Sequence, residues 1–522
     1  SNPANNQPVF MKYLYEAKRD HGTKVVVVNP YLEPGLEKYW VPSSAESMLF
    51  GTKICDLHVP VRPGGDVAFL NAALKQLIAR GAVDRDFIAA HTVGWDTLVA
   101  ELDTQDDADL LGLAGVTRAQ LDAFVDLYAA AGSAVLVWSM GITQRVEGAD
   151  GVEAIVNLGL ARGNVGRDGA GLMPIRGHSG VQGGGEMGAY ATMLPGARSV
   201  TPQNCDALEA AWGFAIPRHV GHTAPEMIEA AERDELDVLY VSGGNFLDVL
   251  PDPPRVAAAM SRVPLRVHQD VVLTSQMLVE PAEGGEVILL PTATRYEQEG
   301  GGTETTTERR IVFSPHIEGH QVGEARSEWR IFGEVASRVR PELAAQFAWP
   351  TNQALREEIA RVVPLYAGIE TLAKTGDSVQ WGGRHLGAGG VFATADGRAR
   401  FSPVAPPVTD VPDGHFAVST RRGKQFNSMV QSTVDPLNGA RRDDVLIDPS
   451  DAATLGLPEG AAVTLTSPTG SMRGRLKFAR LPAGSVQVHW PEGNVLIASG
   501  SDHREPRSNV PDYNAVVTIT AS

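Results

Sequence analysis

The residues from Met173 to Gly188 combine one arginine with a dense run of glycines and small polar side chains. Glycine has no Cβ, so backbone N–H groups in such a run can approach a ligand closely. Arg176 adds a forked guanidinium that suits a carboxylate, a phosphate or another oxyanion. We therefore expect Arg176 and Gly177 to contact an anionic ligand. His178 is either a second donor to that ligand or a packed histidine.

A second cluster of polar and basic residues lies near the C-terminus, from Ser419 to Ser428. It can close over a pyrophosphate through arginine, lysine and backbone donors, or it can be a solvated charge cluster on a turn. Two short polar segments, 492–495 and 511–514, can add to it. The residues expected to contact the ligand here are Thr420, Arg421, Gly423, Gln425, Asn427, Ser428, Asn494, Tyr513 and Asn514. Together with the glycine run, they suggest one large cofactor that carries phosphate groups.

Two aspartates stand at the ends of expected strands. Asp66 follows the turn Arg62–Gly65, and Asp270 closes the run Val267–Asp270. A carboxylate can accept two hydrogen bonds from neighbouring N–H groups of a guanine base. Each aspartate is equally typical of a helix N-cap, and for Asp270 alone the cap is the favoured interpretation. The acidic loop 297–303 also contains glycines and is either a plain acidic loop or a second close approach to the ligand.

Composition narrows the class of protein. The chain has 522 residues, enough for roughly three domains, and 43% of them are hydrophobic. A net charge of -17 argues against non-specific nucleic-acid binding. Only Cys55 and Cys205 occur, so no cysteine-rich zinc or iron–sulfur site can form within this chain, and the usage is typical of a reducing compartment. No apolar run is long enough to span a membrane, and no signal peptide is found, so a cytoplasmic location is expected. We identify no metal ligand, nucleophile elbow or P-loop.

Strands alternate with helices over most of the chain, which predicts an α/β fold. Ligands of such sheets lie at the carboxyl ends of strands, and Gly243 follows one of them. In the first part we expect strands at 24–29, 54–61 and 134–138 and a helix at 67–80. In the second we expect helices at 226–233 and 255–262 and strands at 237–241, 265–270 and 286–290.

Beyond residue 400 the pattern changes to short strands with frequent turns, which predicts a small β-barrel. Four prolines between 403 and 412 indicate a linker before it. The expected barrel strands are 445–447, 462–466, 474–478, 486–489 and 515–519.

Five segments, taken together and in this order, give the chain a resemblance to a known family. They are Ser1–Ala4, Arg62–Asp66, Met140–Gln144, Arg176–Gly188, and Arg421–Ser428 with Glu492–Val495. The chain resembles the catalytic alpha subunit of molybdopterin-guanine-dinucleotide oxidoreductases, above all formate dehydrogenases and their acid-resistance relatives. The resemblance implies two doubly wound dinucleotide-type sheets and a C-terminal six-stranded double-psi β-barrel. It also implies domains at 1–177, 178–405 and 406–522.

The same resemblance implies a cofactor and a chemistry. The cofactor would be bis-molybdopterin guanine dinucleotide with molybdenum or tungsten. Asp66 and Asp270 would hold the guanines, and Arg176 would orient the carboxylate of formate with His178 beside it. Asn2, Gly141, Gln144, Gly177 and Gly243 would contact the cofactor. Formate would be oxidised to CO2, and the electrons would pass to a partner subunit. The alternatives are a reductase of an oxyanion or an N- or S-oxide, and a cofactor-free structural subunit of a respiratory complex. The retained glycine run and basic cluster argue against the structural subunit.

The opening sequence Ser1–Pro8 is typical of a loop that follows a strand, and no Met precedes it. We therefore expect an upstream part that supplies the metal ligand and, if it contains cysteines, an iron–sulfur cluster. Without that part, we expect the first sheet to be incompletely supported and apolar surface to be exposed.

Overall fold

The structure is a computed structural model that describes residues 3–177, 180–319, 321–423 and 432–522. The chain forms two compact units. The first comprises Ser1–Met173, Asp248–Pro254 and His385–Ser522, and the second comprises Pro174–Leu247 and Arg255–Arg384. Residues from 385 onward belong to the first unit, where strand β14 (Ala399–Arg400) pairs in parallel with β3 (Thr92–Val93).

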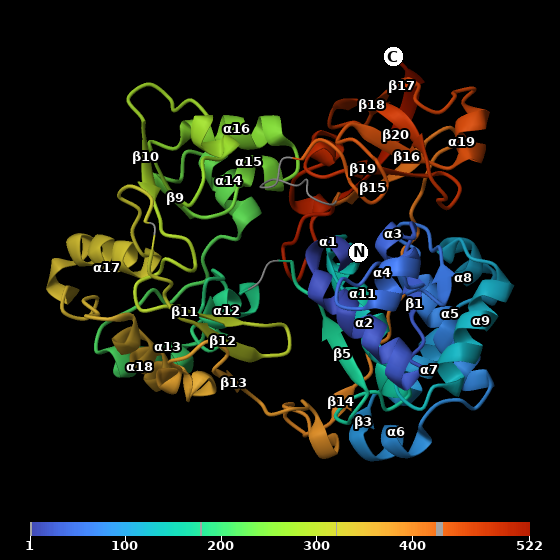
Figure 1. Cartoon of the computed structure of the whole chain (residues 1–522), viewed down its shortest axis with the longest axis horizontal. Coiled ribbons are helices and arrows are strands. Elements are labelled where there is room, and N and C mark those ends of the chain that lie inside the picture. Colours follow the sequence, from blue (N-terminus) through green and yellow to red (C-terminus); the bar gives the residue numbers. More distant parts are fainter. Residues whose placement is uncertain (1–2, 178–179, 320, 424–431) are drawn as a thin grey trace. The chain divides into compact units, whose positions relative to one another are not determined.

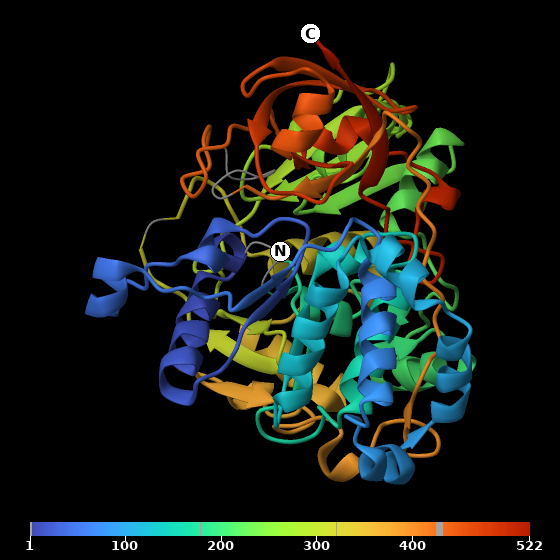
Figure 2. The same ribbon diagram turned by 90° about the vertical axis from the view of Figure 1, so that its right-hand side faces the viewer.

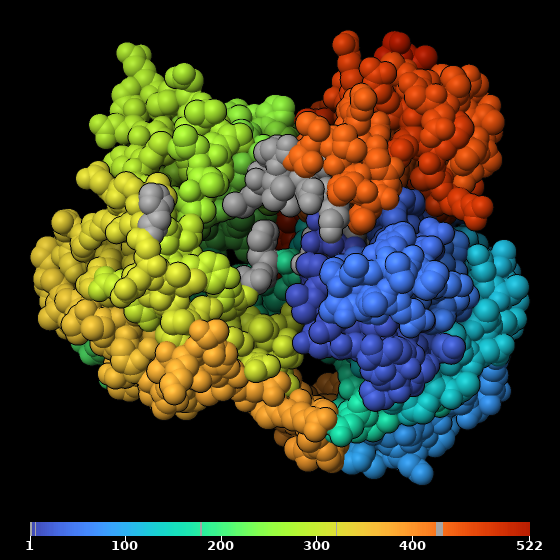
Figure 3. Space-filling view, viewed as in Figure 1, coloured from blue at the N-terminus to red at the C-terminus, as the bar shows by residue number. Residues whose placement is uncertain are grey.

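The α/β half of the first unit is built around the long apolar helix α5 (Asp66–Ala79). It packs against α8 (Asp107–Ala114), α9 (Arg118–Ala130) and α11 (Gly148–Ala161), as the two ribbon views show (Figures 1 and 2). Their buried faces share one core that includes Phe69, Leu74, Leu121 and Leu158. In the space-filling view residues 3–173 form one continuous lobe, blue to green-blue in colour (Figure 3).

The strands of this half are short. Val26–Val28 (β1) runs parallel to Leu57–Val59 (β2), and Val135–Trp138 (β4) pairs with Gly171–Pro174 (β5). The predicted strands are therefore present, but they form two separate pairs instead of one continuous sheet. Each is only three or four residues long, so each pair has few ladder hydrogen bonds and the packed helices carry most of the core.

Two local predictions in this half were wrong. Asp66 is the first residue of α5 and not its N-cap; Gly65 occupies the cap position and no side chain caps the helix. The opening segment is not simply a loop, because Pro3–Asn6 (α1) and Pro8–His21 (α2) are helical. Proline suits the first turn of a helix, since its missing N–H would have no partner there, and both helices begin at one.

The expected linker around residues 403–412 is partly packed onto this half. Phe401 and Val404 are buried. Asn157 donates from its Nδ2 to the carbonyl of Ser402 at 2.6 Å, and Asn71 donates to the carbonyl of Val404 at 2.9 Å. The segment thus runs as a fixed strap along α5 and α11 before it enters the barrel.

The second unit contains the predicted parallel sheet, in the order β10-β9-β8, with strands Glu286–Pro291 (β10), Leu265–Asp270 (β9) and Val238–Ser242 (β8). The predicted helices correspond to α14 (Ala224–Glu232) and α16 (Pro253–Arg262). A further antiparallel sheet was not anticipated; it consists of β11 (Gly302–Thr305), β12 (Arg310–Ser314) and β13 (Ser378–Gln380). It packs over a core that includes Ile311, Phe313 and Tyr366.

The C-terminal part of the first unit is a closed six-stranded barrel, orange to red in Figure 1. Its valines Val418, Val445, Val463, Val486 and Val517 are fully buried inside it. The predicted fold class, α/β with a C-terminal six-stranded double-psi barrel, is confirmed. The strand order is β15-β19-β16-β18-β17-β20, with bounds Phe416–Arg421 (β15), Asp444–Ile447 (β16), Ala462–Thr466 (β17), Ser471–Phe478 (β18), Ser485–His489 (β19) and Asn514–Ala521 (β20).

Candidate cofactor-binding site

The predicted ligand residues of the barrel meet at one of its ends because of strand direction. Strand β15 runs parallel to β19, with Arg421 opposite His489, and antiparallel to β20, with Ser419 opposite Asn514. The last residues of β15 and β19 and the first residue of β20 therefore lie at the same edge. This edge brings together Thr420, Arg421, Gly423, Asn494, Tyr513 and Asn514.

Arg421 ends β15 with its side chain only 4% exposed. Its Nη2 donates to Glu33 Oε2 at 2.6 Å, and its Nη1 donates to His489 Nε2 at 2.8 Å. The carboxylate of Asp435 lies 3.8 Å from Nη1, and the ring of Tyr31 lies beneath the guanidinium. The charge of Arg421 is therefore balanced inside the protein, although sequence reasoning predicted that it faces a ligand phosphate. Its role toward a cofactor stays a prediction.

His489 is fully buried beside Arg421. Burial lowers the pKa of His489 to about 3, and the positive charge of Arg421 acts in the same direction. The imidazole is therefore neutral at physiological pH, which leaves Nε2 free to accept from the guanidinium. Burial raises the pKa of Glu33, while Arg421 lowers it, so the pair is stable as an ion pair only because each charge faces the other.

The other polar side chains at this edge hold backbone segments of the first unit. Asn494 is fully buried, and its Nδ2 donates to the carbonyl of Asp248 at 2.7 Å. The hydroxyl of Tyr513 donates to the carbonyl of Val249 at 2.7 Å. The carbonyl of Gln144 accepts from the backbone N–H of Tyr513 at 3.2 Å and from Asn514 Nδ2 at 3.3 Å. Gln144 thus joins the barrel edge, and its expected contact with the cofactor stays a prediction.

Asp66 and Gly141 are connected to this edge through the segment that contains Gln144 and Arg145. Burial raises the pKa of Asp66, and the charge of Arg145, the residue after Gln144, lowers it. The guanidinium of Arg145 is so close to the turn before α5 that a Cβ on Gly64 would lie 2.7 Å from its Nη2. Gly141 lies in the short helix α10 (Met140–Thr143), exposed and with open space around its Cα.

Arg176 belongs to the second unit and follows the end of β5. It is half-buried, and its Nε is buried without a hydrogen-bond partner among the described residues. Gly177 beside it is exposed. The glycine run continues into α12 (Val181–Glu186), where a Cβ on Gly183 would lie 2.8 Å from Thr305 Oγ1. The backbone is thus held close to its protein neighbours, and its predicted approach to a ligand stays a prediction.

Glu186 anchors this glycine run. Its carboxylate is buried and accepts from Trp381 Nε1 at 3.1 Å and from the hydroxyl of Tyr366. Burial and the Glu186 charge raise the pKa of Tyr366 above its usual range. Because its oxygens are engaged by these donors, Glu186 has a structural role.

Gly243 and Asp270 lie at the carboxyl ends of the adjacent strands β8 and β9, as predicted. Gly243 has a positive φ of 69° and donates from its N–H to the carbonyl of Gln269 at 2.8 Å. Asp270 Oδ1 accepts from the N–H of Val271 at 2.7 Å, which is the local contact of a turn. A Cβ on Gly243 would meet no atom within 4 Å, so a ligand can approach its backbone.

Five predicted site residues lie outside the described residues: Asn2, His178, Gln425, Asn427 and Ser428.

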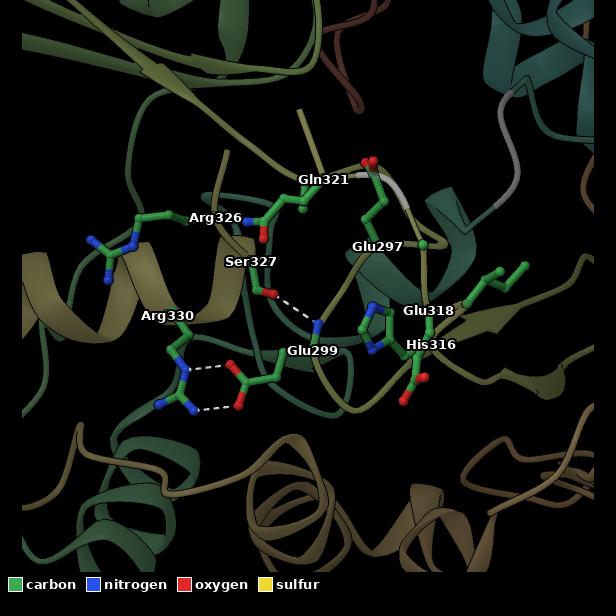
Figure 4. Close-up of a pocket in the computed structure, with 11 residues that line it drawn as sticks. Glu297, Glu299, His316, Glu318, Gln321, Arg326, Ser327 and Arg330 are labelled. Carbon is green, nitrogen blue, oxygen red and sulfur yellow. Dashed lines mark hydrogen bonds and ion pairs between the residues drawn. The ribbon is translucent and has the colours of Figure 1, made fainter. Parts of the chain in front are cut away.

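The acidic loop 297–303 lines a pocket of about 360 Å³ in the second unit (Figure 4). Glu299 faces Arg330 in a two-pronged ion pair, with N–O distances of 2.7 and 2.6 Å, and its N–H donates to Ser327 Oγ. The Glu299 side chain is half exposed. The Glu299 carboxylate is therefore already paired within the protein.

Among the described residues, no cluster of three or more histidine, cysteine, aspartate or glutamate side chains could hold a metal ion. Cys55 and Cys205 are both buried thiols. No helix in the part that the structure describes has the length and apolar character needed to cross a membrane.

Comparison with protein families places these features. Residues 1–338 match the family described as molybdopterin oxidoreductase. The chain belongs to that family. Residues 416–517, which are the barrel, match the molydopterin dinucleotide binding domain. The two family matches therefore support the predicted molybdopterin-type cofactor.

Relatives of known name cover nearly the whole chain. Protein YdeP of Escherichia coli K12 is 28% identical over 99% of this chain and 70% of its own length. The F420-dependent formate dehydrogenase 1 subunit alpha of Methanococcus maripaludis is 28% identical over 98% of this chain and 74% of its own. Among solved structures, acetylene hydratase from Pelobacter acetylenicus superposes with a TM-score of 0.67 at 15% identity, over 97% of this chain and 75% of that one. This last likeness shows the fold.

Three buried polar atoms support the fit to such a cofactor. Trp490 Nε1 and Asn494 Oδ1 at the barrel edge, and Arg176 Nε in the second unit, have no partner among the described residues. Buried polar atoms are nearly always hydrogen-bonded, so these three have hydrogen-bonding capacity that a bound group could use. Sequence reasoning missed Trp490, Glu33 and Arg145, which matter only because the fold brings them to this edge.

Proposed function

We propose that this chain is the catalytic component of a bis-molybdopterin guanine dinucleotide oxidoreductase with molybdenum or tungsten. It oxidises formate to CO2 in the cytoplasm and passes the electrons to a partner subunit. The observation that carries the proposal is Arg176, a half-buried arginine whose Nε has no hydrogen-bond partner among the described residues and which precedes an exposed glycine. A relative whose name is that of a formate dehydrogenase subunit supports it.

The chemistry needs one anchored anion and one acceptor of electrons. Oxidation of formate removes one proton and two electrons and leaves CO2. The cofactor, when bound, supplies the two-electron chemistry. The guanidinium of Arg176 pairs with the carboxylate of formate and fixes its orientation, so that the C–H bond is the part left free to react. Binding at a half-buried site strengthens this pairing, because less water competes for the charges.

Asp66 and Asp270, the two carboxylates predicted to bind guanine, have different surroundings. Burial raises the pKa of Asp66, and the nearby charge of Arg145 opposes that shift and so supports the carboxylate form that accepts from two N–H groups. Asp270 ends β9 and Gly243 follows the neighbouring strand β8, at the edge where ligands of parallel sheets bind. We assign one guanine to each aspartate.

The decisive experiment combines composition with turnover. Purified chain is analysed for molybdenum, tungsten and acid-released guanine, and dye-linked activity is assayed with formate, nitrate and a sulfoxide. Absence of metal and guanine would instead favour a structural subunit. Turnover of nitrate or the sulfoxide without formate would favour a reductase, since Arg176 suits any small oxyanion.

The role of Arg176 is tested by substitution. Arg176→Gln should lower kcat/KM for formate by about 100-fold or more, and Arg176→Lys by less, because lysine keeps the charge but not the fork. Arg338→Gln is the matched control, since that arginine is 75% exposed on α17 (Glu328–Val339). Equal kcat/KM values for Arg176→Gln and the wild type would refute the anchor.

A further inference from the structure

Two neighbouring arginines at the end of β15 have opposite surroundings. Arg421 is held by the carboxylate of Glu33 and the imidazole of His489. Arg422 has no ion pair or hydrogen bond with any of the described residues. Among the residues that the structure describes, none therefore compensates the charge of Arg422.

Arg422 is nevertheless not a surface arginine. Its guanidinium carbon lies 3.6 Å from the centre of the Trp490 ring, a close cation–π stack. Burial lowers the pKa of Arg422 to about 10, and Tyr513 is near enough to oppose that shift. Holding a desolvated cation without a counter-charge is costly, so this position calls for an anion.

The residue beneath it points to the same kind of ligand. Trp490 is 7% exposed, and its Nε1–H is buried without an acceptor among the described residues. An indole N–H can only donate. The guanidinium of Arg422 and the indole N–H of Trp490 are both hydrogen-bond donors and neither is an acceptor. Oxyanions accept hydrogen bonds from such donors.

We propose that Arg422 and Trp490 bind the pyrophosphate of the dinucleotide cofactor, and that Arg421 is a structural residue of the barrel edge. This assignment rests on the proposed function for the identity of the cofactor, but the anion site itself rests on the two side chains. Sequence reasoning chose Arg421 from the pair, and only the buried partners of Arg421 separate the two roles.

The test measures anion binding and cofactor content separately on the full chain. Inorganic pyrophosphate is titrated into cofactor-stripped protein by calorimetry, and acid-released guanine is measured in protein as purified. Arg422→Gln should weaken pyrophosphate binding roughly 10- to 100-fold, the range for a lost charged hydrogen bond, and lower guanine content. Trp490→Phe keeps the stack but removes the donor, so it should weaken binding by a smaller factor. Arg473→Gln, an exposed arginine on β18 of the same barrel, is the matched control and should bind as the wild type does.

Each outcome decides one of the two claims. The anion site is overturned if the Arg422→Gln variant binds pyrophosphate as tightly as the wild type does. It is also overturned if the wild type binds no pyrophosphate. If the wild type contains no guanine but binds pyrophosphate more tightly than Arg422→Gln does, the proposed function is refuted and the anion site is supported. If Arg422→Gln does not fold, Arg422→Lys and Trp490→Phe carry the comparison, and unchanged affinity in both overturns the site.

Discussion

Arg421 Nη2 and Glu33 Oε2 lie 2.6 Å apart, with the two side chains only 4% and 5% exposed. They come from opposite ends of the chain, because Glu33 precedes the short helix α3 (Pro34–Glu37) and Arg421 ends the first barrel strand. The pair therefore ties the barrel to the α/β half of the first unit.

Breaking this pair from one side should be strongly destabilising. Arg421→Met leaves the Glu33 carboxylate buried without its cation, and about 3–5 kcal/mol of unfolding free energy should be lost. Thermal melting measures the loss, and Glu37→Gln, an exposed carboxylate one turn away, is the control. The double variant Glu33→Gln with Arg421→Met should recover part of the loss. If the double variant were no better than the single one, the uncompensated charge would not be the cause.

His489 should make stability depend on pH below neutrality. Its pKa is 6.5 when exposed and about 3 in the folded state, so between these values the unfolded chain binds a proton that the folded chain does not. Unfolding free energy should therefore fall as pH drops from 6.5 toward 3, by up to about 1.4 kcal/mol per pH unit. His489→Gln, which does not titrate, should show a shallower slope in denaturant unfolding measured across this range. Identical slopes in the two proteins would mean that His489 is protonated in the folded state.

The turn before α5 should not tolerate a side chain at Gly65. A Cβ there would lie 2.7 Å from the Cα of Ala114 and 2.9 Å from two backbone carbonyl oxygens at the end of α8. Gly65→Ala should cost about 1–3 kcal/mol, the usual penalty of overpacking. Gly112→Ala, inside α8 with open space around it, should be neutral or stabilising by up to about 1 kcal/mol. Denaturant midpoints of the two variants give the comparison, and similar values would rule out the clash.

The side chain of Asn494 should hold the backbone of residues 248–250 in its folded conformation. Its Nδ2 donates to the carbonyls of Asp248 at 2.7 Å and Val249 at 3.3 Å, so Asn494→Ala removes both hydrogen bonds of a fully buried side chain, at a cost of about 1–3 kcal/mol. Hydrogen exchange of the amides at 248–250 should speed up. Tyr513→Phe removes a single bond to Val249 and should have a smaller effect, and Tyr13→Phe, at an exposed tyrosine, should have none. Unchanged exchange in Asn494→Ala would show that other contacts hold this segment.

The local elements followed from local patterns. Strand β9 has the predicted bounds Leu265–Asp270, and β17 has the predicted bounds Ala462–Thr466. Periodicity and turn residues specify such elements because they act over a few neighbouring positions. The antiparallel sheet β11-β12-β13 was missed, since β13 lies more than sixty residues beyond β12 and nothing local predicts that pairing.

The sequence by itself determined the α/β class, the barrel strands and the set of polar segments from which a cofactor site could be built, because residue type and spacing carry that information. Only the tertiary structure decided which side chains remain available to a ligand. Arg421 and Arg422 are adjacent and chemically identical, yet one faces a buried carboxylate and the other an indole. The physical reason is that burial and counter-charge come from residues far away in the chain, such as Glu33 and Trp490, and these are brought together by folding alone.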